Sequence, residues 1–127
     1  MLVVDSATHT VLHTLKGHSY GVYGCAFSPD GTLLATASVD KTVILWQVET
    51  GAEVRTLMHT DCVCGVVFTA DGMHIITASF TIARVWDVAS GTPVHTMTLP
   101  DQGCSVALSA SGTLLAFAFC NGMVALF

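Results

Sequence analysis

The chain alternates between short apolar segments and closely spaced turn residues. The segments are rich in Val, Leu, Ile, Thr, Phe and Trp, which are enriched in β-strands, and they recur at intervals of about ten residues. This pattern predicts an antiparallel all-β protein. We expect strands at about residues 9–15, 21–27, 33–38, 42–48, 53–58, 63–68, 74–79, 82–88, 93–98, 104–109, 113–119 and 123–127.

Two kinds of turn alternate between these strands. Asp30-Gly31 and Asp71-Gly72 are two-residue hairpin signals, because such turns need a positive φ that Asp-Gly adopts easily. Thr50-Gly51 and Ser90-Gly91 mark a second kind of turn, midway between the first. The spacing predicts units of four strands, each a twisted sheet.

The sequence also repeats itself with a period of about forty residues. The segment Phe-Ser-Pro-Asp-Gly at 27–31 returns at 68–72 and, in weaker form, at 108–112. Trp46 returns as Trp86 and then as Phe127. Such a period is typical of stacked repeats, in which each unit needs a neighbour to bury its apolar face. Stacked arrays more often hold partners than perform chemistry.

Composition narrows the possible functions. Apolar residues make up 52% of the chain and charged residues 10%, which excludes a disordered protein. The net charge is −5, and the four basic residues are scattered, so no basic stripe is available to neutralise phosphates. We therefore expect no nucleic-acid partner and no binding to an anionic membrane. The basic residues are Lys16, Lys41, Arg55 and Arg84.

The five cysteines are an odd number at low density, which predicts reduced core thiols in a cytoplasmic or nuclear protein. They are Cys25, Cys62, Cys64, Cys104 and Cys120. No secretory signal pattern stands at the N-terminus. Residues 102–127 carry no charge, which is compatible with a membrane span. Turn residues interrupt that stretch in phase with the earlier repeats, so we interpret it as buried strands.

The first repeat carries Gly17-His18, the segment 27–31, the run 33–42 and Trp46. This combination strongly resembles the WD-repeat (WD40-type) family, whose units form the blades of a β-propeller. The second repeat ends in the family dipeptide itself at residues 86–87. The resemblance covers nearly the whole chain, as one array over 1–127 with repeats at about 9–48, 53–88 and 93–127. It implies a partial propeller of about three four-stranded blades in an incomplete ring.

In that family a hydrogen-bonded chain of His, Ser or Thr, Asp and Trp crosses each blade. The resemblance maps this tetrad onto His18, Ser38, Asp40 and Trp46, and in the second repeat onto His59, Ser79 and Trp86. A buried imidazole needs partners at both ring nitrogens, which a carboxylate and a hydroxyl provide. We therefore interpret His18 and Asp40 as structural and expect no catalytic residue, no metal and no cofactor.

The later repeats depart from the family pattern. In the second, Met58 stands where Gly17 does, one residue is missing, and the Asp is lost, with Thr81 a weak substitute. The third has no His and a shortened loop at 100–102. We expect apolar packing there instead, with Phe119, Asn121 and Phe127 at the positions of Ser38, Asp40 and Trp46.

The phase of the repeats places both chain ends inside a blade. Residues 13–15 match 95–97, which puts Val4-Asp5 on Trp86-Asp87, in a third strand. We expect complete sheets at about 21–58 and 63–98, a three-stranded sheet at 103–127 and a spare outer strand at 9–15. Either the chain is a section of a longer propeller, or copies of it close a ring together. Two chains with swapped strands would make six blades.

Propellers of this family bind partners at the rim of the central channel. The resemblance implies partner-binding positions at Tyr20, Gly21, Val39, Asp61, Cys62, Phe80 and Gln102, with Gly103 and Cys120 beside them. Tyr20 and Phe80 are the strongest anchors, because exposed aromatic residues contribute much to interfaces. The alternative for Phe80 is that its ring fills the gap left by the missing residue.

The leading hypothesis is a non-enzymatic scaffold that binds other proteins or peptides, alongside further blades or a second copy. A second hypothesis is a propeller-borne enzyme or metal site at His59, Asp61 and Cys62, since these residue types ligate zinc. The paired ligand spacing of structural zinc sites is absent, however. A third hypothesis is a truncated chain without independent function.

Overall fold

The computed structural model of the chain describes residues 1–126. These residues form thirteen strands and no helix. The strands are β1 Leu2–Val4, β2 Val11–Thr14, β3 Val22–Phe27, β4 Leu33–Ser38, β5 Thr42–Gln47, β6 Glu53–Met58, β7 Val63–Phe68, β8 His74–Ser79, β9 Ile82–Asp87, β10 Pro93–Thr98, β11 Gly103–Leu108, β12 Leu115–Phe119 and β13 Val124–Leu126.

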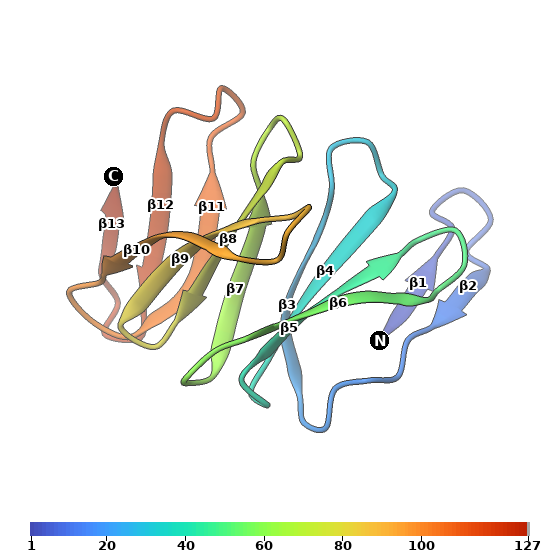
Figure 1. Cartoon of the computed structure of the whole chain (residues 1–127), viewed down its shortest axis with the longest axis horizontal. Coiled ribbons are helices and arrows are strands. Elements are labelled where there is room, and N and C mark those ends of the chain that lie inside the picture. The colour runs from blue at the N-terminus through green and yellow to red at the C-terminus, as the bar shows by residue number, and fades with distance from the viewer. Residues whose placement is uncertain (127) are drawn as a thin grey trace.

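The strands form separate antiparallel sheets that stand side by side along an open arc (Figure 1). The first sheet has the order β3-β4-β5-β6, and the second has β7-β8-β9-β10. The third sheet is β11-β12-β13, and β1 and β2 form an N-terminal hairpin. The all-β partial propeller expected from the sequence is confirmed. The equivalence expected between Phe127 and Trp46 lies outside the described residues.

The innermost strands of neighbouring sheets approach each other closely, and glycine makes this possible. A Cβ on Gly24 of β3 would lie 2.8 Å from the carbonyl oxygen of Cys64 on β7. A Cβ on Gly65 of β7 would lie 2.9 Å from the backbone nitrogen of Val106 on β11. Because backbone contacts cannot yield as side chains do, these two positions fix the separation of the sheets.

The apolar core lies between the sheets, so each sheet buries two different faces. We call the side that carries Trp46 or Trp86 the tryptophan face, and the opposite side the alanine face. The alanine face of the first sheet, with Ala35 and Ala37, packs on the tryptophan face of the second. The alanine face of the second sheet, with Ala78 and Ala83, packs on the third. The N-terminal hairpin covers part of the tryptophan face of the first sheet through Val3 and Leu15.

The expected outer strand at 9–15 is present as β2, but it is not spare. It pairs with β1, with Leu2 opposite Thr14 and Val4 opposite Val11. The pairing is interrupted by a bulge, as is the pairing of β5 with β6 and of β9 with β10. The hairpin β1–β2 is therefore equivalent to the two outer strands of a complete sheet.

The prediction of reduced core thiols is wrong. Cys104 on β11 and Cys120 just after β12 form a disulfide, with their Cα atoms 5.9 Å apart. Their strands are hydrogen-bonded neighbours, and this separation is within the range that a disulfide spans. The remaining thiols are not core residues either, since Cys25 is exposed and Cys62 and Cys64 are half-buried.

The uncharged stretch at 102–127 forms strands as far as it is described. Within residues 1–126, no helix has the length and apolar character needed to cross a bilayer.

Candidate functional site

A hydrogen-bonded network crosses the first sheet, next to the edge where the partner-binding residues were predicted. His18 Nδ1 lies 2.9 Å from Asp40 Oδ2, and since a carboxylate only accepts, Nδ1 is the donor. His18 Nε2 lies 2.7 Å from the hydroxyl of Thr36. Trp46 Nε1 donates to the same hydroxyl at 2.9 Å. The network links the loop before β3 to strands β4 and β5.

Thr36, and not Ser38, supplies the hydroxyl of this network. Ser38 Oγ donates to the backbone oxygen of Gly21 at 2.9 Å and accepts from the backbone nitrogen of Asp40 at 3.1 Å. Both side chains lie on the same face of β4, so strand alternation alone does not choose between them. Thr36 is opposite Ile44 in the middle of the ladder, where the imidazole and the indole meet. Ser38 instead shapes the turn at the end of β4.

The carboxylate of Asp40 is held ionised at the end of the network. Burial alone would raise its pKa, but hydrogen bonds from Thr42, His18 and the backbone of Ser19 outweigh this and lower the pKa to about 2. Thr42 donates to Asp40 through both its hydroxyl and its backbone nitrogen. The carboxylate thereby ties the turn between β4 and β5 to the loop before β3.

The second sheet keeps three members of the network. His59 Nε2 lies 2.9 Å from the hydroxyl of Thr77, and Trp86 Nε1 donates to that hydroxyl at 3.1 Å. Ser79 again lies elsewhere, donating to the backbone oxygen of Asp61. The hydroxyl position predicted at Ser79 therefore belongs to Thr77.

Within residues 1–126, no carboxylate is hydrogen-bonded to His59, and Nδ1 instead lies 3.2 Å from the carbonyl oxygen of Leu57. Burial lowers the pKa of His59 to about 4, and the nearby Arg84 contributes in the same direction. The imidazole is therefore neutral near pH 7.

The third sheet replaces the network with apolar side chains. Leu99 takes the place of His59 in the preceding sheet, because Leu99 N donates a hydrogen bond to Thr81 O as His59 N donates one to Lys41 O. Phe117 stands at the ladder position of Thr36 and is fully buried. Phe119 is also buried. Asn121 does not take part in a network of this kind and donates to Asp101 at 2.7 Å.

The strand registers bring the predicted rim positions to one end of the three sheets. Val22, Val63 and Gly103, which begin the innermost strands, are paired with the last residues of β4, β8 and β12. The loops that precede β3, β7 and β11 and the turns that follow β4, β8 and β12 therefore lie at one edge of the sheets, the lower edge in Figure 1. We call this edge the rim. The predicted residues on it are Tyr20, Gly21, Val39, Asp61, Cys62, Phe80 and Gln102.

The aromatic rim residues are accessible. Tyr20 is 71% exposed and Phe80 is 42% exposed, so the ring of Phe80 does not simply fill a gap. Phe80 has a φ of 46°, and its carbonyl accepts from Gly103 N at 2.7 Å, which joins the second sheet to the third. Gly21 and Gln102 are exposed, whereas Val39, Asp61 and Cys62 are half-buried.

The structure does not assemble the metal site considered at His59, Asp61 and Cys62. Both ring nitrogens of His59 face other partners, namely Thr77 and Leu57. Asp61 accepts from the backbone of Cys62. Among residues 1–126, no group of three or more His, Cys, Asp or Glu side chains is placed to hold a metal ion.

Comparison with known families agrees with the repeats and the network. The sequence pattern of the family described as "WD domain, G-beta repeat" matches residues 9–47 and 51–87, more than half of the chain. The chain belongs to the WD-repeat family. Its sheets accordingly correspond to blades. The network in the first sheet, formed by His18, Thr36, Trp46 and Asp40, has the residue types of the tetrad that the resemblance implied.

Several curated WD-repeat relatives are similar over part of the chain. A chromatin assembly factor 1 protein of Mus musculus is 41% identical over 71 residues, which are 55% of this chain and 12% of that protein. Protein Mut11 of Chlamydomonas reinhardtii is 54% identical over 44 residues, 35% of this chain and 12% of that protein. U3 small nucleolar RNA-associated protein 21 of Saccharomyces cerevisiae is 30% identical over 81 residues, 64% of this chain and 9% of that protein. The chain thus matches only a small section of each relative.

Proposed function

We propose that this WD-repeat chain is a non-enzymatic scaffold that binds other proteins or peptides at the rim. The observation that carries the proposal is the pair of exposed aromatic residues, Tyr20 and Phe80, in rim segments whose backbone is hydrogen-bonded to neighbouring elements. Asp40 and Ser38 fix the loop around Tyr20 through the backbone of Ser19 and Gly21. A rigid loop with an exposed aromatic ring loses little entropy on binding.

The relatives suggest the setting of this scaffold. One is named as part of a chromatin assembly factor and another as associated with a small nucleolar RNA. We propose a nuclear location on this basis, with the cytoplasm as the alternative. The partner is a protein or peptide, because the scattered basic residues offer no track for a nucleic acid. Arg55 in addition is engaged with the backbone of the second sheet.

The test is a comparison of rim and control variants in partner binding. Proteins captured by the wild-type chain are identified, and the affinity of each is measured by calorimetry. We expect Tyr20→Ser combined with Phe80→Ser to weaken binding at least about tenfold, as for interface hot spots. Met73→Ser is the matched control, since Met73 is 62% exposed on the hairpin at the opposite edge. Equal loss in both variants, or no loss in the rim variant, would refute the rim as the binding site.

A further inference from the structure

At the rim of the first two sheets, a serine hydroxyl ties the end of one strand to the loop before the innermost strand. Ser38, the last residue of β4, donates to the backbone oxygen of Gly21 at 2.9 Å. Ser79, the last residue of β8, donates to the backbone oxygen of Asp61 at 3.2 Å. In both sheets a side chain at the strand end therefore holds the loop that leads into the neighbouring strand.

The third sheet makes this connection with a covalent bond. Phe119, the last residue of β12, stands at the ladder position of Ser38 and Ser79, and its ring has no hydroxyl to donate. The next residue, Cys120, is bonded to Cys104 at the start of β11, with Cα atoms 5.9 Å apart. The disulfide thus joins the two segments that a serine hydroxyl joins in the other sheets.

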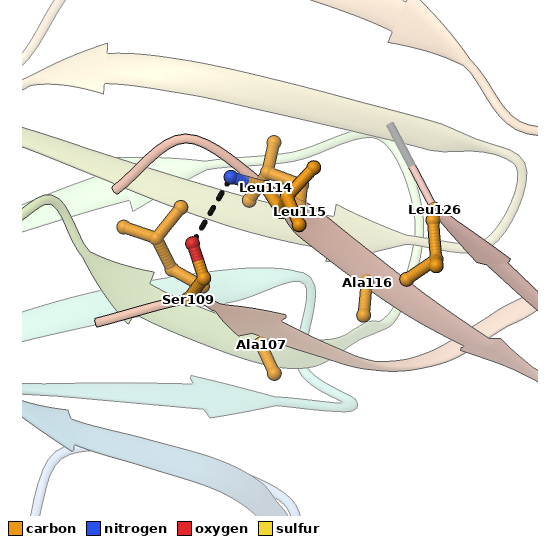
Figure 2. Close-up of a pocket in the computed structure, with 7 residues that line it drawn as sticks. Ala107, Ser109, Leu114, Leu115, Ala116 and Leu126 are labelled. Atoms are coloured by element: carbon orange, nitrogen blue, oxygen red, sulfur yellow. Dashed lines mark hydrogen bonds between the residues drawn. The ribbon is translucent and has the colours of Figure 1, made fainter. Parts of the chain in front are cut away.

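The opposite edge of the third sheet keeps its hydroxyl contact. In the hairpin between β11 and β12, Ser109 Oγ accepts from the backbone nitrogen of Leu114 at 3.1 Å (Figure 2). The hairpins of the first and second sheets have the same contact, from Leu33 to Ser28 and from His74 to Thr69. The change from a hydroxyl to a disulfide is therefore confined to the rim.

The disulfide is accessible to dissolved reagents, because Cys120 is exposed and Cys104 is half-buried. Two further hydrogen bonds join the same segments at the surface. Cys120 N donates to the carbonyl oxygen of Gln102 at 3.0 Å, and Asn121 donates to Asp101 at 2.7 Å. Exposed hydrogen bonds add little, since water competes for the same atoms. Beyond the strand ladder, the covalent bond is therefore the strongest constraint between this loop and this turn.

The same loop supports one of the proposed binding residues. Gly103, which precedes Cys104, donates through its backbone nitrogen to the carbonyl oxygen of Phe80 at 2.7 Å. Phe80 has a φ of 46°, a backbone conformation that is uncommon for an aromatic residue and depends on the surrounding contacts. The order of the segment at 102–104 therefore affects how the ring of Phe80 is presented.

The second sheet holds an unpaired cysteine at the equivalent position. Cys64 lies at the bulge of β7, as Cys104 does at the bulge of β11, but Phe80 and not a second cysteine follows β8. Burial raises the pKa of the Cys64 thiol, so it is protonated near pH 7 and reacts poorly as a nucleophile. Cys64 is therefore a natural control for the disulfide.

The compartment gives this bond a regulatory meaning. The nucleus and the cytoplasm, which were proposed above as locations, keep most thiols reduced, and the disulfides that form there are mostly transient or sense the redox state. A thiolate can attack only a disulfide that it can reach. Location and accessibility together favour a bond that opens and closes over one that is purely structural.

We propose that the disulfide between Cys104 and Cys120 is a redox switch that regulates partner binding at the rim. This regulation rests on the proposed scaffold function. In the oxidised chain, the bond orders the loop before β11 and, through Gly103, the backbone of Phe80, so the ring binds with a small loss of entropy. In the reduced chain, the loop and the turn after β12 move more freely, and the affinity for the partner falls.

The reductant is a dithiol, either a small molecule or a protein. Its thiolate attacks the sulfur of the exposed Cys120, forms a mixed disulfide and displaces the thiolate of Cys104, which takes up a proton. The second thiol of the reductant then attacks its own sulfur in the mixed disulfide and releases Cys120 as a thiol. The two cysteines gain two electrons and two protons, and the dithiol loses both as it becomes a disulfide. Exchange with another disulfide reverses the reaction.

The first test needs no partner. The full chain is equilibrated in buffers with increasing ratios of reduced to oxidised glutathione, and the peptide linked through Cys104 and Cys120 is quantified by mass spectrometry after alkylation. We expect the linked peptide in oxidised buffer and its loss as the buffer becomes reducing. A linked peptide that is absent at every ratio, or that persists in fully reduced glutathione, would overturn the switch.

Hydrogen exchange then measures what the bond orders. On reduction, amides at 100–104 and 119–123 should exchange at least about tenfold faster, whereas the hairpin at 109–114 should not change. The double variant Cys104→Ala, Cys120→Ala should exchange at the fast rate in both buffers, and Cys64→Ala should respond as the wild type does. Equal exchange rates at 100–104 in the oxidised and reduced chains would overturn the effect on the loop.

A binding measurement separates the switch from the proposed function. Calorimetry uses a protein identified in the capture experiment above. We expect an affinity at least about fivefold lower for the reduced chain and for the double cysteine variant, as for a typical coupling between two sites. Equal affinity in both redox states, with weaker binding by the variant Tyr20→Ser, Phe80→Ser, would refute the regulation and leave the scaffold function in place. Full binding by that rim variant would instead refute the rim as the binding site, and with it this regulation.

Discussion

At the centre of the first sheet, a threonine hydroxyl joins an imidazole to an indole, whereas the same ladder position in the third sheet holds the buried ring of Phe117. The residue opposite this position on the adjacent strand also differs between the two sheets. Thr36 is opposite Ile44, and Phe117 is opposite the smaller Ala125. In the third sheet the large ring of Phe117 and the small Ala125 together fill the space that the smaller Thr36 and the larger Ile44 fill in the first sheet.

The loss of the polar network in the third sheet is complete and not partial. Once Leu99 stands in place of the histidine, a hydroxyl at position 117 would lack its buried partner. The second sheet has lost only the carboxylate of the network, because the carbonyl oxygen of Leu57 takes its place beside His59 Nδ1. A member at the end of the network is therefore replaceable, whereas the central ones are kept or lost together.

The largest expected effect comes from the apolar centre of the third sheet. Phe117→Ala leaves a cavity between the second and third sheets and should lower the free energy of unfolding by about 3–5 kcal/mol. The measurement is urea unfolding followed by tryptophan fluorescence, at one fixed protein concentration because association shifts stability.

Phe80→Ala is the matched control for this change. Phe80 is half-exposed on the rim, so its truncation should cost less than about 1 kcal/mol. Similar losses in both variants would contradict the interpretation that Phe117 replaces the network as the centre of its sheet.

The next effect concerns the polar centre of the first sheet. Thr36→Val keeps the shape but leaves His18 Nε2 and Trp46 Nε1 without their common partner, at a cost of about 2–4 kcal/mol. Ser38→Ala removes bonds to the backbone at the rim and should cost about 1 kcal/mol in the same unfolding experiment. A larger loss of stability in Ser38→Ala than in Thr36→Val would show that Ser38, and not Thr36, is the central hydroxyl of the network.

A third prediction concerns the pH dependence of stability that His59 gives to the second sheet. The pKa of His59 is lowered from 6.5 to about 4 in the folded state, so the unfolded chain binds a proton first as the pH falls. Stability should therefore decrease by about 2–3 kcal/mol from pH 6.5 down to about 4, and then level off. Chemical unfolding at each pH measures the decrease.

His59→Gln should flatten this decrease, because an amide keeps a donor and an acceptor but does not titrate. His74→Gln, at a half-buried histidine of the same sheet, should leave the decrease intact. An unchanged slope in His59→Gln would show that another group controls the pH dependence.

Local signals were sufficient to predict the strands, the four-stranded units and the family. The Asp-Gly turns and the alternation of apolar residues act within a few residues of the chain, so they do not depend on the packing of the sheets. The N-terminal phase was also readable, since matching residues 13–15 to 95–97 placed Val4 in a third strand, where β1 lies.

Contacts that depend on depth or on neighbouring strands were not predicted. Thr36 and Ser38 share a face and differ only in distance from the end of β4, so the sequence could not say which one meets the indole. The disulfide joins residues sixteen apart whose approach depends on the pairing of β11 with β12.

The smallest expected effect comes from the end of the network in the first sheet. The folded pKa of Asp40 is about 2, lowered from 3.8, so its contribution is present above pH 3.8 and is lost as the pH falls toward 2. Because this carboxylate lies close to the rim, solvent screening limits the contribution to about 1 kcal/mol. Asp40→Asn should therefore reduce the loss of stability in this acidic window and leave the window between pH 6.5 and 4 unaltered. Unfolding curves of the variant and the wild type across both windows measure this. A change in the higher window would mean that the two sheets titrate as one unit, which would contradict the independence of their tetrads.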